Sequence, residues 1–164
     1  MIEAHLYHAT QDALAIGTEV RARTRASGAR VEDALETHRP ARCHQRSSSF
    51  FACAGRFEAW RYLSAQLGHE LSDARLYRVS IPGAQRHPMA LVDAINARLG
   101  DIPTVRAMID EYWCPTHDWS FWEYLGPAMT VEERVEPPDA ISASIALLIY
   151  QKDKALIQRL WPRP

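Results

Sequence analysis

Three short segments of this 164-residue chain carry side chains that could act on the bond between a sugar and a base. Residues 6–10 (LYHAT) include His8, residues 48–52 (SSFFA) place Phe50 beside serines, and residues 122–125 (WEYL) hold Glu123 among apolar neighbours. Each segment has the composition of a strand. We therefore expect three strands, each of which delivers one chemical group to a common site.

These groups suit the cleavage of an N-glycosidic bond to a positively charged base. The transition state is an oxocarbenium-like sugar, which a nearby carboxylate stabilises. An aromatic ring can hold the leaving base, and a polar side chain can fix a ribose hydroxyl. Glu123, Phe50 and His8 could fill these roles without a metal ion if their strands converge.

Each residue also has an ordinary structural role open to it. His8 could pack against Tyr7, because isolated histidines rarely do chemistry. Adjacent residues of a strand face opposite ways, so at most one of Phe50 and Phe51 lines a pocket. Glu123 could be a solvated carboxylate near a strand end, although its apolar flanks favour a cleft.

Apolar periodicity predicts the elements that must position these groups. Strands are expected at residues 4–9, 48–53, 75–81, 121–125 and 129–135. Helices are expected at residues 31–38, 56–67, 88–99 and 103–112. Asp139 should cap a long helix that reaches about residue 160 and buries Leu148. The prediction is an α+β fold of about five strands in a single domain, residues 1–164.

Composition and charge indicate which partners and which compartment the sequence favours. The formal net charge of −1 does not favour a nucleic-acid or membrane partner, and no secretory signal or membrane span is visible. The odd cysteine count indicates a reducing compartment. We expect a cytoplasmic protein, with export as an effector left open. Arg21, Arg23 and Arg25 alternate along an extended edge or arm, usually a solvated arrangement, and binding to phosphates or to an acidic target is the alternative.

The three segments, in this order, resemble the motifs of the ADP-ribosyltransferase fold. The branch is the one with a His-aromatic-Glu triad, which includes poly(ADP-ribose) polymerases and rifamycin-modifying transferases. The resemblance spans about residues 4–136 and leaves the C-terminal helix, about 139–160, outside it. It implies a split mixed or antiparallel sheet with peripheral helices, and NAD as co-substrate.

The resemblance also implies roles for individual residues. His8 would bond a ribose hydroxyl of NAD, and Glu123 would bond the 2′-hydroxyl of the nicotinamide ribose and carry catalysis. The nicotinamide pocket would be formed by the remaining candidates, Ala9, Thr10, Ser48, Ser49, Phe50, Trp60 and Tyr62. Phe50 replaces the triad's usual tyrosine. The Ser47-Ser48-Ser49 run resembles the Arg-Ser-Glu toxin branch, but Phe121 replaces that branch's second glutamate.

In this fold, the loop before the catalytic glutamate usually reads the target. Here it holds Trp113, His117 and Trp119, which would contact the acceptor if they are exposed, while burial of the tryptophans in the core is the alternative. The sequence leaves three acceptor classes open, a protein, a nucleic acid or a small molecule, and it is also compatible with a neutralising partner protein. NAD hydrolysis or phosphorolysis, and a non-catalytic binding domain, remain alternatives.

Two other chemistries are less favoured by the sequence. Cys114 and His117 have a spacing found in metal sites, but Cys43 and His44 lack the gap expected of a second ligand pair. No local pattern marks a cysteine nucleophile. We therefore expect no metal and no thiol chemistry.

Overall fold

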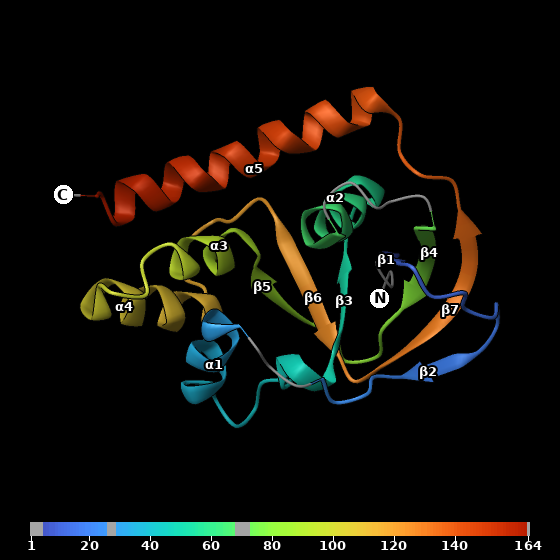
Figure 1. Ribbon diagram of the computed structural model, residues 1–164, viewed down its shortest axis with the longest axis horizontal. Helices are drawn as coiled ribbons and strands as arrows, with labels where there is room; N and C mark the ends of the chain where they lie inside the picture. Colours follow the sequence, from blue (N-terminus) through green and yellow to red (C-terminus); the bar gives the residue numbers. More distant parts are fainter. Residues whose placement is uncertain (1–4, 26–28, 68–72, 164) are drawn as a thin grey trace.

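The chain forms an α+β fold, as predicted (Figure 1). The computed structural model describes residues 5–25, 29–67 and 73–163. Within them, seven strands form one antiparallel sheet in the order β2-β7-β4-β1-β3-β6-β5. The strands are β1 (Leu6–Thr10), β2 (Glu19–Arg21), β3 (Phe50–Cys53), β4 (Arg75–Ser80), β5 (Gln85–Pro88), β6 (Trp122–Gly126) and β7 (Ala128–Val135).

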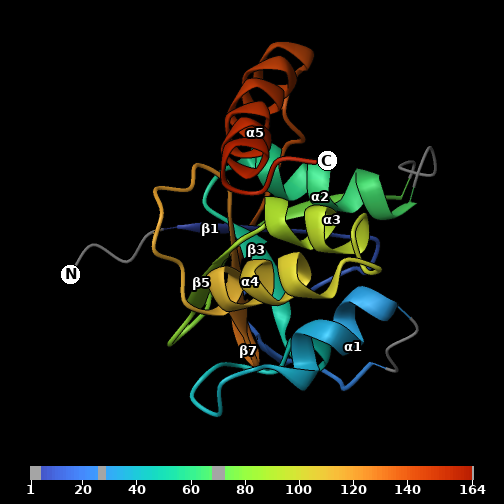
Figure 2. The ribbon, with the colours of Figure 1, turned by 90° about the vertical axis from the view of Figure 1, so that its left-hand side faces the viewer.

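The described helices lie on one side of this sheet and follow one another in space in the order α1, α4, α3, α2, α5 (Figure 2). Their bounds are α1 (Arg30–Thr37), α2 (Arg56–Leu67), α3 (Ala90–Asn96), α4 (Ile102–Trp113) and α5 (Ala140–Leu160), with a 3-10 turn η1 (Arg46–Ser48) before β3. None of the helices within the described residues is both long and apolar enough to cross a membrane.

Buried residues form two clusters, one on each face of the sheet. The larger cluster joins the helices to Ala9, Cys53 and Leu76, with Tyr7 packed against it. The smaller cluster contains Leu6, Tyr77 and Met129, with Phe50 packed against it. Since neighbouring residues of a strand alternate between faces, β1 and β3 each send side chains into both clusters.

The joint between β1 and β3 is short. These strands share a single register pair, Tyr7 with Cys53, whereas β1 and β4 pair at each residue from Leu6 to Thr10. A side chain reinforces the joint, because His8 Nδ1 lies 2.7 Å from the Phe51 carbonyl oxygen. The sheet is therefore weakly paired at its centre, next to two of the three predicted motifs.

Helix α5 is fastened to the strand that carries Glu123. The buried Asp153 carboxylate accepts hydrogen bonds of 2.8 Å from the backbone N–H groups of Ser120 and Phe121, just before β6. Tyr150 packs edge-on against Phe121 with ring centroids 5.6 Å apart. Helix α5, which lies outside the three motifs, thus contacts the segment that leads into β6.

Several predictions about elements were wrong. The sheet contains β2 and β5 in addition to the expected strands, and Pro88 ends β5 instead of beginning a helix. Leu148 is 61% exposed, so it does not lie on the buried face of α5. The segment of β5 was missed because QRHP shows no apolar alternation, although His87 and Pro88 are buried against β6 and α4. Residue 4 lies outside the described residues.

Candidate functional site

Glu123 is a buried carboxylate on the helix-covered face of the sheet. On β6 it stands opposite Cys53 of β3 and His87 of β5, and it is 1% exposed. Its Oε1 accepts a 2.6 Å hydrogen bond from the Tyr112 hydroxyl and a short charged contact from Arg46 Nη1. Its Oε2 has no hydrogen-bond partner among the described residues. One oxygen is therefore anchored, and the other is buried with its hydrogen-bonding capacity unused.

Arg46 is the cation that permits this burial. Its guanidinium bonds both oxygens of Glu32, at 2.7 and 2.9 Å, as well as Glu123 and the Tyr112 hydroxyl. The group lies 4.8 Å from the centroid of the Phe51 ring. Burial opposes its charge, but Glu123 and its other partners raise the pKa of Arg46 above its ordinary value. Because a buried charge needs such pairing, Arg46 and Glu123 depend on each other.

A cavity of about 210 Å³ opens beside this carboxylate. Its walls come from α1, η1, α2, α3, β6 and α5, through Glu32, Arg46, Arg61, Tyr62, Met89, Val92, Asp93, Glu123 and Tyr150. Tyr62 stacks on Phe51 with ring centroids 5.5 Å apart, and burial, followed by the charge of Glu123, raises the pKa of its hydroxyl. The cavity thus combines an aromatic wall with a carboxylate side chain.

This arrangement can bind a hydroxyl group and stabilise positive charge. A hydroxyl donated to Glu123 Oε2 would complete the hydrogen bonding of a buried acceptor. Positive charge that develops next to the carboxylate would be stabilised strongly, since water is largely excluded. Ring stacking against Tyr62 would suit a flat leaving group.

His8 lies on the opposite face of the sheet. It lines a separate cavity of about 590 Å³ together with Thr10, Ser49, Phe50 and arginines that include Arg23. Its ring meets Phe50 edge-on at 5.6 Å. Burial lowers the pKa of His8, so the ring is neutral near pH 7, and the Phe51 carbonyl fixes the proton on Nδ1.

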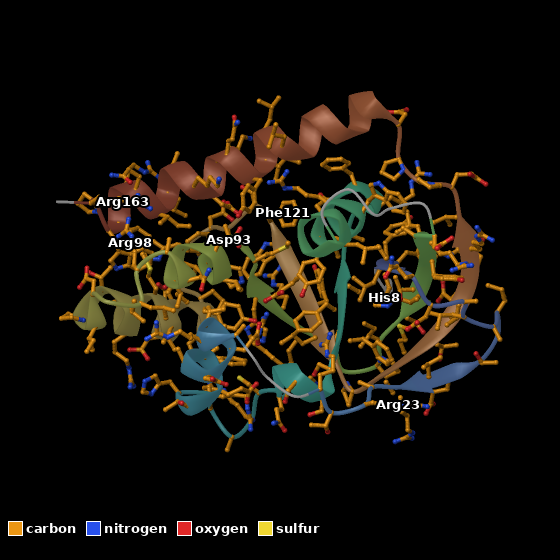
Figure 3. The ribbon with its side chains drawn as sticks, viewed as in Figure 1. His8, Arg23, Asp93, Arg98, Phe121 and Arg163 are labelled. Atoms are coloured by element: carbon orange, nitrogen blue, oxygen red, sulfur yellow. The ribbon has the colours of Figure 1, made fainter. Side chains whose placement is uncertain are left out.

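The structure therefore does not bring the three predicted groups to one site. Tyr7, Cys53 and Glu123 form one row across β1, β3 and β6, so they share a face, while His8 follows Tyr7 and points the other way. Figure 3 shows Asp93, a wall residue of the Glu123 cavity, on the side of β3 where β6 lies, and His8 on the side where β1 lies. The expected convergence of His8 and Phe50 with Glu123 was wrong.

The remaining predicted pocket residues divide between these places. Thr10 and Ser49 lie with His8, whereas Tyr62 lies with Glu123. Ala9 and Trp60 pack in the larger core cluster and line neither cavity. Ser48 donates a hydrogen bond to Gln45. Of the candidates beyond the triad, Tyr62 is thus the one that lies beside the carboxylate.

The predicted acceptor loop also differs from expectation. Trp113 and Trp119 are buried, and their indole N–H groups bond the Leu35 carbonyl and Glu111 Oε1 at 2.9 and 2.8 Å. His117 is exposed. Bulky aromatic side chains gain more from burial than from exposure in a loop, so these tryptophans belong to the core and not to a recognition surface.

Glu111 holds this loop together. Burial alone would raise its pKa, but hydrogen bonds from Trp119, Thr116 and His117 outweigh burial and lower it to about 2. A carboxyl with a depressed pKa stabilises the fold above its unfolded value near 4.5 and loses that contribution as pH falls towards 2. We expect the free energy of unfolding, measured by urea titration, to fall across this window.

The matched comparison is Glu111→Gln, which removes the titrating group. It should cost about 1–3 kcal/mol at pH 7 and should flatten the decline between pH 5 and pH 2. An equally steep decline in the variant would show that other carboxyls cause it.

Two important residues of the Glu123 site escaped the sequence analysis. Arg46 begins the short 3-10 turn η1 between α1 and β3, where the sequence shows no periodic pattern, and the sequence analysis treated Tyr112 only as part of a helix. The sequence did contain one signal of a cationic partner, the carboxylates Glu32 and Glu36 one helical turn apart. In the structure Glu32 pairs with Arg46, and Glu36 pairs with Arg39 and accepts the backbone N–H of Arg46. No spacing rule connects these side chains to Glu123, because the contacts are tertiary.

Within residues 5–25, 29–67 and 73–163, no three His, Cys, Asp or Glu side chains gather so as to hold a metal ion. Cys43, Cys53 and Cys114 are free thiols. Burial raises the pKa of Cys53, which lies beside Glu123 in the sheet.

Comparisons with known proteins add no further identification. No protein-family model matches the chain, and no curated protein or solved structure is significantly similar to it. The functional assignment therefore depends on the residues and geometry described above.

Proposed function

We propose that this protein is an NAD-dependent mono-ADP-ribosyltransferase, which cleaves the bond between nicotinamide and ribose and transfers ADP-ribose to an acceptor. The Glu123 carboxylate carries this proposal. It is buried, its Oε1 is anchored by Tyr112 and Arg46, its Oε2 has no partner among the described residues, and its side chain lines a cavity. A buried acceptor left without a partner costs free energy, which a ligand hydroxyl would recover.

In this mechanism, Glu123 bonds a hydroxyl of the nicotinamide ribose and stabilises the positive charge that develops on the sugar. The bond between C1′ and the pyridinium nitrogen breaks, and the nitrogen keeps the electron pair, so nicotinamide leaves neutral. The acceptor then bonds C1′ and releases its proton. Tyr62 provides the flat wall for nicotinamide.

His8 has a positioning role in this proposal. Its bond to the Phe51 carbonyl holds β3 against β1 where the strands share one register pair. The Phe51 ring in turn contacts Tyr62 and the guanidinium of Arg46. His8 would thus influence the Glu123 cavity through β3, without touching the ribose that Glu123 holds.

The direct test is incubation of the protein with NAD that carries a label in its adenosine. Transfer predicts release of nicotinamide together with label on an added acceptor (a protein extract, a nucleic acid or a small-molecule pool). Hydrolysis predicts nicotinamide release with free labelled ADP-ribose, and phosphorolysis predicts a phosphorylated product when phosphate is supplied. Absence of nicotinamide release under all these conditions would contradict the proposal.

A non-catalytic binding domain is the second candidate. The separation of His8 from Glu123 favours it, because the groups named by the motifs do not act on one sugar. This candidate predicts saturable binding of NAD or a partner protein with no nicotinamide release. Calorimetric titration with NAD, run beside the release assay, separates the two candidates.

A further inference from the structure

The Glu123 cavity continues towards a cationic groove between α3 and α5. Asp93 and Tyr150 line the cavity, and they also line a second hollow of about 310 Å³ that extends along α3. Ala97, Arg98 and Arg163 line this hollow and a third one beyond it. The three hollows therefore follow one another from Glu123 along α3 to the end of α5.

We propose that this groove, named here the α3–α5 groove, binds the diphosphate of the nucleotide whose ribose occupies the Glu123 cavity. The inference rests on the proposed function and adds the place and the residues that hold the substrate's anionic part. The groove comprises the second and third hollows, and its cations are Arg98, Lys154 and Arg163.

The small volume of the Glu123 cavity is the first reason to place the diphosphate in the α3–α5 groove. The cavity measures about 210 Å³, below the range of about 300–1,000 Å³ typical of pockets that enclose a whole drug-sized ligand. A dinucleotide is larger than such a ligand, so the cavity can hold only its reacting end. The remainder must leave through the cavity mouth, and Asp93, which is exposed, lies there.

The different charges of the cavity and the groove are the second reason. Three carboxylates, Glu32, Asp93 and Glu123, line the cavity against two guanidiniums, Arg46 and Arg61. In the groove the balance is reversed, because three cations face Asp101 and the shared Asp93. NAD has the same polarity, with a positive pyridinium at one end and a negatively charged diphosphate further along. The two charge patterns match in that order.

The three groove cations differ in the contacts that they already make within the protein. Arg98 donates a 2.6 Å hydrogen bond to the Trp161 carbonyl, and Lys154 lies 5.0 Å from the centroid of the Tyr150 ring. Arg163 makes no described hydrogen bond or ion pair. Figure 3 shows Arg98 and Arg163 close to each other at the end of α5, with Asp93 nearer β6. Guanidinium and ammonium donors of this kind suit phosphate oxygens.

The cations on the other face are less suited to this ligand. Arg21 pairs with Glu19 at 3.1 Å, and Arg25 donates to the Ser49 carbonyl. Both line the His8 cavity, which opens on the opposite face from Glu123, and Arg25 also lies 5.0 Å from the centroid of the Phe51 ring. Strands β3 and β6 pair at every position from Phe50 to Cys53, so a ligand held by Glu123 cannot reach that cavity through this part of the sheet.

The test compares two double variants that each remove two exposed cations. Lys154→Gln with Arg163→Gln removes two of the three groove cations and leaves Arg98 bonded to Trp161, and Arg21→Gln with Arg23→Gln removes two of the three arginines of the His8 cavity. Binding of ADP-ribose is measured by calorimetry, and the melting temperature of each variant confirms its fold. We expect the groove variant to bind about 10- to 100-fold more weakly, and the control to stay within about twofold of wild type.

Nicotinamide release supplies an independent readout. The groove variant should raise KM for NAD and leave kcat close to wild type, because the diphosphate contacts lie away from the reacting bond. Loss of ADP-ribose binding in the control variant instead would overturn the groove assignment and leave the proposed function standing. If the wild type releases nicotinamide but does not bind ADP-ribose, the groove assignment alone is wrong. If it neither releases nicotinamide nor binds ADP-ribose, both the groove assignment and the proposed function are wrong.

Discussion

Glu123→Gln is expected to lower kcat for nicotinamide release by about 10²- to 10³-fold while the protein remains folded. Glutamine has nearly the shape of glutamate, and its side-chain oxygen can still accept the hydrogen bond from Tyr112. What disappears is the negative charge beside the cavity. Since that charge stabilises the oxocarbenium-like transition state more than the ground state, the loss falls on kcat.

The measurement is a steady-state nicotinamide-release assay, with circular dichroism and thermal melting to confirm the fold. Glu133→Gln is the matched control, because it makes the same chemical change on β7, where Glu133 pairs at the surface with Arg78 at 3.2 Å. The control should retain wild-type turnover. Wild-type turnover in Glu123→Gln would remove Glu123 from the mechanism.

Arg46→Met is expected to destabilise the protein by about 3–5 kcal/mol. Methionine fills a similar volume beside Phe51 but supplies no charge and no hydrogen-bond donor. Glu123 would then be buried with the Tyr112 hydroxyl as its remaining partner, and Glu32 would lose both contacts from the guanidinium. An uncompensated buried carboxylate is among the most costly defects of a core.

Equilibrium unfolding in urea measures this effect. The informative comparison is the double variant Arg46→Met with Glu123→Gln, in which the buried anion is also neutralised. It should regain part of the lost stability, and the resulting coupling energy reports the interaction between the two side chains. If Arg46→Met costs less than about 1 kcal/mol, or the cycle shows no coupling, the two residues do not form the dependent pair described here.

Local patterns predicted most elements because they depend on near neighbours. The alternation around Tyr77 and Val79 predicted a strand, which is present as β4. The spacing of Phe57, Trp60 and Leu63 predicted a helix, which is present as α2 with the predicted bounds. The sequence missed β5, whose burial comes from packing against β6 and α4. It also placed Trp113 and Trp119 in an exposed loop, because nothing local shows that Leu35 and Glu111 accept their indole N–H groups.

The sequence by itself determined that Glu123 stands among aromatic and apolar neighbours, which favoured a carboxylate in a cleft over a solvated one. It also determined that His8 and Phe50 belong to strands. Only the tertiary structure decided that these two residues and Glu123 face different sides of the sheet, and that Arg46 and Tyr112 hold the carboxylate. The reason is that the pairing register between strands sets which face a side chain takes, and a shift of one residue reverses it. Register arises from contacts between residues far apart in the chain, such as Tyr7, Cys53 and Glu123, which local sequence patterns do not specify.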